Sequence, residues 1–136
     1  EIGVRLVGSE MCIRDSYKTA AILFNKKQLS KAKQYALKSI SLDGSNGKPY
    51  ILIANMYASS PNWSDENALN KCTYFAVIDK LQRAKSVDSS VEEEANKLIG
   101  TYSRYTPKDE DLFFLGLKKG DSVTIGGWIG ETTTIR

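Results

Sequence analysis

Two pairs of small and apolar residues recur at a fixed distance in the first half of the chain. Ala20 and Leu23 are followed by Ala54 and Tyr57, a shift of 34 residues. Between the pairs lies a second segment with apolar residues at helical spacing: Leu29, Ala32, Ala36, Ile40 and Leu42. A repeat of this length is typical of two antiparallel helices that bury their apolar faces only against neighbouring repeats. The pattern therefore predicts stacked helix pairs with a groove open to a partner.

The apolar spacing and the helix-stopping residues together predict the helix boundaries. Ser30 is expected to cap the second helix, and Ser90 with Glu93 is expected to form a capping box before the last one. Pro49 fits the first turn of a helix, where its missing N–H is not needed. The predicted helices cover residues 17–26, 30–42, 49–57, 66–85 and 91–105.

The second repeat is longer than the first. The interval from Ala54 to the next equivalent position, Ile99, is 45 residues, which exceeds the first interval of 34 by 11. We expect an elongated turn and helix around residues 61–73 to absorb this extra length.

The last thirty residues change character. Residues 109–117 are predicted to form a helical turn, and residues 121–136 a β-hairpin rich in Val, Thr and Ile and interrupted by glycines. Because an isolated hairpin is marginally stable in water, this one is expected to pack against the helices. Its predicted anchors are Phe113, Phe114 and Trp128.

The first sixteen residues are treated separately. Residues 1–16, above all the stretch from Val7 to Ser16, resemble a translated sequencing-adapter read-through and lack a periodicity that joins the repeat. We expect this segment to be poorly ordered or to pack only opportunistically. The alternative is a native helix or strand that precedes the repeat. We therefore divide the chain into a non-native segment (1–16), helical repeats (17–105), and a helical turn with a hairpin tail cut at its end (106–136). If the full gene encodes a signal peptide or a membrane anchor, we expect it in a missing N-terminal segment.

The composition disfavours catalysis and metal binding. The 136 residues include no histidine, which removes the commonest general base, Ser-His and Cys-His nucleophile pairs, and most zinc and haem sites. Cys12 and Cys72 fit no metal-ligand spacing, and Cys72 is interpreted as a buried apolar residue. No apolar run is long enough to span a membrane. The sequence therefore predicts a non-enzyme without cofactor or metal.

Lysines dominate the charge of the first helix pair. Between residues 17 and 48 seven lysines accompany a single acidic residue, Asp43, and no arginine. Nucleic-acid binders usually combine such lysines with arginine and aromatic residues. We interpret these lysines as a solvated helix face and predict no nucleic-acid partner.

These repeat features resemble the tetratricopeptide (TPR) family over residues 17–105, although Gly44 and Ser89 stand where the usual helix-ending proline is expected. The segments beginning at Asp111, Lys119 and Gly126 are similar to the C-terminal end of bacterial TPR proteins of the cell envelope. The resemblance implies a mainly α fold, a TPR-like α-solenoid of antiparallel helix pairs with a small C-terminal β-hairpin. It also implies an exported scaffold, in the periplasm or at the outer membrane.

The expected function is protein–protein interaction through the concave groove of the repeats, with a peptide or protein segment as partner. By the geometry of the repeat, the residues expected to face this groove are Tyr17, Ala21, Phe24, Ile51, Asn55 and Ala58. At the positions where chaperone-binding TPR domains hold a carboxylate with Lys, Arg and Asn, only Asn55 matches, so a carboxylate clamp is not expected. The alternative function is a ligand-binding module in which the Trp128 hairpin recognises a sugar or peptide.

Overall fold

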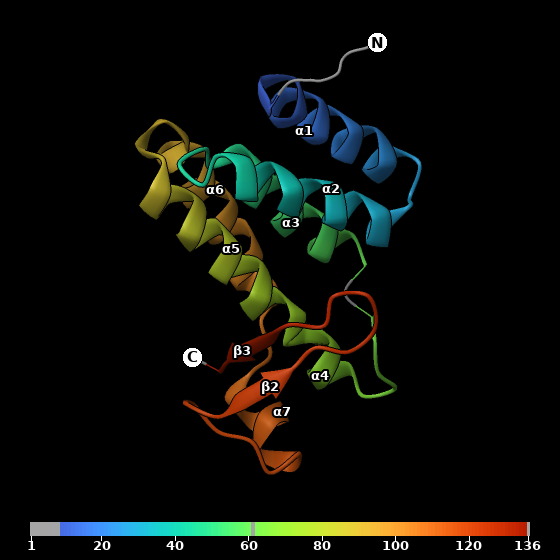
Figure 1. Ribbon diagram of the computed structural model, residues 1–136. Helices are drawn as coiled ribbons and strands as arrows, with labels where there is room; N and C mark the ends of the chain where they lie inside the picture. Colours follow the sequence, from blue (N-terminus) through green and yellow to red (C-terminus); the bar gives the residue numbers. More distant parts are fainter. Residues whose placement is uncertain (1–8, 61, 136) are drawn as a thin grey trace.

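Helices make up most of the computed structural model, which describes residues 9–60 and 62–135, and a two-stranded antiparallel sheet lies near the C-terminus (Figure 1). The α-helices are α1 (Ser9–Asn25), α2 (Leu29–Leu42), α3 (Lys48–Ser59), α4 (Asn67–Lys71), α5 (Thr73–Val87), α6 (Glu92–Tyr102) and α7 (Asp109–Phe114). Two 3-10 turns, η1 (Ser89–Val91) and η2 (Ser103–Tyr105), flank α6, and the strands are β2 (Ser122–Thr124) and β3 (Thr132–Thr134). The prediction of a mainly helical chain with a small C-terminal hairpin is confirmed.

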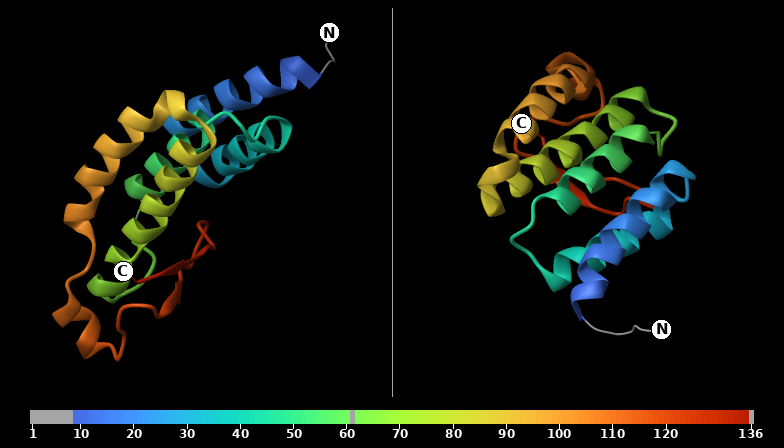
Figure 2. Two further views of the ribbon diagram at one scale, coloured as in Figure 1. Left: turned by 90° about the vertical axis from the view of Figure 1, so that its left-hand side faces the viewer. Right: turned by 90° about the horizontal axis from the view of Figure 1, so that it is seen from above.

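The helices stack in the order of the chain. α1 packs on α2, α2 on α3, α3 on α5, and α5 on α6. Seen from above, they form a row that runs from the α1/α2 pair to the α5/α6 pair (Figure 2). The side view of Figure 2 places α6 and the β-hairpin on opposite sides of α5. The face beside α6 is therefore not covered by the hairpin.

Small residues let the helices approach closely. Ala20, Ala32, Ala36 and Ala54 are completely buried, as the spacing of the repeat predicts for Ala20, Ala32 and Ala54. Larger side chains fill the space between α3 and α5, and those with no exposed surface include Ile53, Met56, Tyr57, Val77 and Leu81. Because protein interiors are close-packed, we expect the core at these positions to be sensitive to added side-chain bulk.

Replacing Ala54 by leucine tests this packing. Ala54 has no exposed surface, and the extra carbons of leucine must push α3 away from its neighbours. We expect the free energy of unfolding to fall by about 2 kcal/mol, as overpacking of a filled core usually costs. Urea denaturation followed by circular dichroism measures the change. An unchanged midpoint would contradict the packing described for α3.

The helices α2 and α5 end on the same kind of turn. After α2, the carboxylate of Asp43 accepts hydrogen bonds from the backbone N–H of Ser45 at 3.1 Å and from its hydroxyl at 2.6 Å. After α5, Asp88 accepts the equivalent bonds from Ser90 at 3.0 and 2.6 Å. The hydrogen bonds from Ser45 hold the pKa of Asp43 below its ordinary value. The pKa of Asp88 is likewise lowered, chiefly by the bond from the backbone N–H of Gly47 and next by the bond from the Ser90 hydroxyl.

Two predicted helix starts are wrong. α1 begins at Ser9 rather than Tyr17, within the segment 1–16 that the sequence predicts to be non-native, while residues 1–8 lie outside the described residues. The physical reason is that adding a turn to an existing helix is much easier than nucleating one. α2 begins at Leu29 with Gln28 before it and no side-chain cap, so Ser30 lies inside the helix.

The predicted helix over residues 66–85 is two helices, with Cys72 between α4 and α5. The side chain of Asn70 holds the preceding loop, because its oxygen accepts from the backbone N–H groups of Trp63 at 2.9 Å and Ser64 at 2.8 Å. The extra length of the second repeat therefore lies in the predicted region, but as a loop and a separate short helix, α4.

The predicted capping box before α6 is also wrong. The hydroxyl of Ser90 donates to Asp88, and Asp88 rather than Ser90 caps the 3-10 turn η1 that leads into α6. Asp88 also accepts a bond from the backbone N–H of Gly47 at 2.9 Å, so this carboxylate joins the start of α3 to the end of α5.

The hairpin packs on the helices, and of its three predicted anchors only Trp128 packs against the core. Phe113 and Phe114 are 77% and 78% exposed, so their prediction as anchors is wrong. The buried residue of α7 is Leu112, because a helix of little more than one turn presents only a narrow face to the rest of the molecule. The strands pair with Val123 opposite Thr133, and the buried apolar residues of the hairpin are Val123, Ile125, Ile129 and Ile135.

Candidate binding surfaces

Three helices contribute to a cavity of about 240 Å³ on the face that the repeat predicts to be the groove. Tyr17 comes from α1, Ile51 and Asn55 come from α3, and Glu94 comes from α6. The predicted residues Tyr17, Ile51 and Asn55 are thus brought together. The sequence did not predict the other lining residues, which are Lys48, Leu52 and Glu94. The spacing of one repeat places Tyr17 near Ile51, but only the stacking of α6 on α5 brings Glu94 to the same cavity.

The other predicted groove residues lie outside the lining of this cavity. Ala21, Phe24 and Ala58 are half-buried and pack against the hydrophobic core. Ile51 itself is only 5% exposed, so most of its side chain is part of the core as well. Tyr17 and Asn55 are the predicted residues that keep substantial accessible surface at the cavity.

Polar groups surround the apolar part of this cavity. Burial, and secondarily the negative charge of Glu94, raises the pKa of the Tyr17 hydroxyl, so Tyr17 remains a neutral hydrogen-bond donor at physiological pH. The hydroxyl of Tyr102 donates to the side-chain oxygen of Asn55 at 3.1 Å, which joins α6 to α3. Lys48 and Glu94 place opposite charges at the same cavity.

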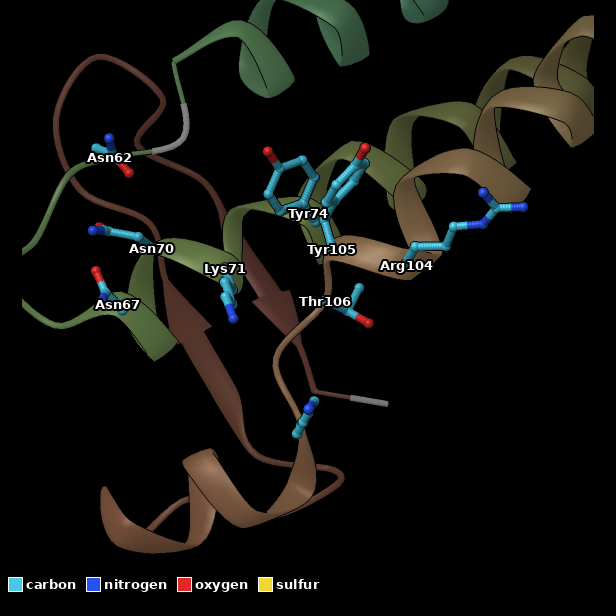
Figure 3. Close-up of a pocket in the computed structure, with 9 residues that line it drawn as sticks. Asn62, Asn67, Asn70, Lys71, Tyr74, Arg104, Tyr105 and Thr106 are labelled. Carbon is cyan, nitrogen blue, oxygen red and sulfur yellow. The ribbon is translucent and has the colours of Figure 1, made fainter.

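A second cavity, of about 300 Å³, lies between α4, the first turn of α5 and the connection from α6 to α7 (Figure 3). Its lining residues are Asn62, Asn67, Asn70, Lys71, Tyr74, Arg104, Tyr105, Thr106 and Lys108. None of the predicted site residues lies here. The sequence feature that could have pointed to this cavity is the elongated turn around residues 61–73. Its amides and its lysine face the α6–α7 connection only in the folded chain.

The Trp128 hairpin is tied to the helices by polar and aromatic contacts. Trp128 is half-buried and meets the ring of Tyr57 edge-on, with centroids 5.4 Å apart. The Tyr57 hydroxyl donates to Glu131, which also forms an ion pair with Lys80 at 2.8 Å. Burial, and then the bond to Glu131, raises the pKa of Tyr57. These contacts favour a packing role for Trp128 over the exposed platform considered as the alternative.

Within residues 9–60 and 62–135, no group of three or more His, Cys, Asp or Glu side chains is arranged to hold a metal ion. Over the same residues, no helix is both long and apolar enough to cross a membrane. Asp79 and Glu131 line a smaller cavity, and both carboxylates join the hairpin to the helices. Thr133 donates to Asp79 at 2.6 Å, and Glu131 contacts Tyr57 and Lys80.

Cys72 is completely buried between α4 and α5, and this burial raises the pKa of its thiol to about 11. At pH 8 only about one thiol in a thousand is then ionised. In a Cys12→Ser background, we expect Cys72 to react with iodoacetamide more than about a hundredfold more slowly in the native protein than in urea, because the thiolate is the reactive form. Mass spectrometry of timed samples gives both rates. Native labelling within about tenfold of the unfolded rate would contradict the burial of this thiol.

Comparisons of the chain with protein-family models, with curated proteins and with solved structures give no match.

Proposed function

We propose that this chain is a TPR-like helical repeat protein that acts as a non-catalytic interaction module. In this proposal, an extended or helical segment of a protein partner binds along the face formed by α1, α3 and α6. The single observation that carries it is the shared cavity of Tyr17 and Ile51: the two residues lie 34 positions apart, and Glu94 of α6 completes the lining. Equivalent positions of successive repeats on one concave surface are how helical repeat proteins bind extended partners.

The repeated turns support the same proposal. Asp43 and Asp88 end α2 and α5 with equivalent hydrogen bonds to Ser45 and Ser90. Their separation of 45 residues equals one 34-residue period plus the 11 extra residues that the α4 region absorbs. In this proposal, the pairs α1/α2 and α3/α5 are two units of one type, and α6, which packs on α5, lies where the next unit would begin.

The lining of the cavity suits a polypeptide segment. The ring of Tyr17 offers apolar surface to a partner side chain, and Leu52 adds the 9% of its surface that is exposed. The amide of Asn55 offers hydrogen-bonding groups of the kind that pair with a peptide backbone. Lys48 and Glu94 favour a partner with charges of both signs, because each can pair with the opposite charge.

Selection of displayed peptides on the full chain, followed by binding measurements on variants, tests the proposal. Asn55→Arg places a bulky cation in the cavity, and we expect it to weaken the selected peptides at least about tenfold. Lys38→Glu, on the exposed face of α2, is the matched control and should leave their affinity unchanged. The opposite result would be unchanged affinity for Asn55→Arg and Tyr17→Ala and lost binding for Trp128→Ala, with all variants folded by circular dichroism. It would show that the peptides bind to the hairpin and not to the groove.

A further inference from the structure

The cavity at the α6–α7 connection has a lining that the groove proposal does not use. Among the lining residues, Lys71, Arg104 and Lys108 are cations, and there is no carboxylate. Within the part of the chain that the structure describes, none of these three cations forms an ion pair. Asp65, Glu66 and Asp111 line a neighbouring cavity that Lys71 also borders, beyond ion-pair distance. The lining therefore favours an anionic group.

One wall of the cavity is aromatic. Tyr74 and Tyr105 have ring centroids 5.3 Å apart with planes tilted by 35°, and Tyr74 stacks on Tyr102 at 6.0 Å. Because the rings contact each other, no slot remains between them for a planar base. Tyr105 nevertheless keeps 51% of its surface exposed, so this ring has surface available for contact on one side. Such one-sided contact suits the apolar C–H face of a saturated sugar ring.

Amide side chains lie across from this wall. Figure 3 shows Asn62 and Asn67 on one side of Lys71, with the tyrosine pair and Thr106 on the other. Asn70 is engaged by the loop, since it also donates to the carbonyl of Ser64 at 2.9 Å. Asn62 and Asn67 are exposed, and each carries both donors and an acceptor, the combination that matches neighbouring hydroxyl groups.

We propose that this cavity binds an acidic monosaccharide, a pyranose ring that carries a carboxylate or a phosphate group. The ring rests on Tyr105, the hydroxyls bond to Asn62 and Asn67, and Lys71 and Lys108 hold the anion. Arg104 extends away from Lys71 in Figure 3, so it borders the site rather than forming its centre. The site is separate from the proposed protein-binding groove and does not depend on it.

Titration of the isotope-labelled full chain, followed by amide chemical shifts in two-dimensional NMR, tests the proposal. The probes are glucuronate, glucose 6-phosphate, glucose and AMP. We expect at least one of the two acidic sugars to shift the amides around Asn67, Lys71 and Tyr105, with an affinity at least about tenfold above that of glucose. The ratio between glucuronate and glucose 6-phosphate identifies the favoured anion.

Variants separate the role of the ring from that of the charge. Tyr105→Ala should weaken the acidic sugars about tenfold or more, and Tyr105→Phe should retain binding because it keeps the ring. Lys71→Gln combined with Lys108→Gln should remove the preference over glucose, while Lys38→Gln, remote on α2, should change nothing. The proposal is overturned if neither acidic sugar shifts these amides at about 20 mM, or if AMP binds more tightly than both acidic sugars. It is also overturned if the double lysine variant still prefers the acidic sugars over glucose.

Discussion

Replacement of Gly47 by alanine is expected to lower the free energy of unfolding by about 3 kcal/mol, the upper part of the range for added bulk in a filled site. A Cβ atom at Gly47 would lie 2.6 Å from Cγ2 of Val91 and 2.8 Å from the backbone oxygen of Ala84. The φ of Gly47 is −78°, which any residue adopts, so the requirement is one of space and not of backbone conformation. Because the oxygen of Ala84 belongs to the last turn of α5, it cannot rotate away, and α3 must shift instead.

Gly44 provides the matched control for this substitution. It lies in the same turn between α2 and α3, and a Cβ there would have its nearest contact at 3.7 Å, an ordinary van der Waals distance. Gly44→Ala should therefore stay within about 0.5 kcal/mol of the parent protein. Chemical denaturation of the three proteins gives the comparison. Equal midpoints for both variants would show that α3 does not approach the end of α5 as closely as described.

The second large effect is expected in α7, where neighbouring residues should differ sharply. Leu112 is 1% exposed, and its truncation to alanine should cost about 3 kcal/mol by loss of buried surface and formation of a cavity. Phe113 is larger but 77% exposed, so Phe113→Ala should change stability by less than about 0.5 kcal/mol. Thermal and urea unfolding measure both changes. A greater loss from Phe113→Ala than from Leu112→Ala would restore the phenylalanine as the anchor of the tail.

The local pattern of the sequence was sufficient for the helix pairs and the hairpin. The recurrence of Ala20 and Ala54 predicted two buried positions one repeat apart, and both are completely buried. The Val, Thr and Ile residues and the glycines of residues 121–136 predicted a hairpin, and Val123 lies in β2 with its side chain buried. The helix prediction succeeds because burial of one face imposes a period of its own on a helix.

The cap before α6 and the buried residue of α7 depended on which side chains compete for one partner or one space, and the local pattern does not show this. Ser90 is a good capping residue, but Asp88 engages its hydroxyl and forms the cap itself. In α7, Phe113 and Phe114 are the larger apolar side chains, yet the narrow buried face of the helix holds Leu112. Local preference is overruled when another side chain already occupies the partner or the space.

Residues far apart in the sequence meet where the hairpin closes on the helices. Glu131 accepts from Tyr57, which is 74 positions away, and the backbone of Ile129 accepts from Lys33, which is 96 positions away. The cavity that joins Lys71 to Tyr105 likewise requires α4 to lie beside the α6–α7 connection. Periodicity along the chain thus predicted the buried alanines of the helix pairs, whereas Leu42 of the same pattern is 36% exposed. Only the tertiary structure decided which side chains share a surface, because that depends on how distant elements pack against one another.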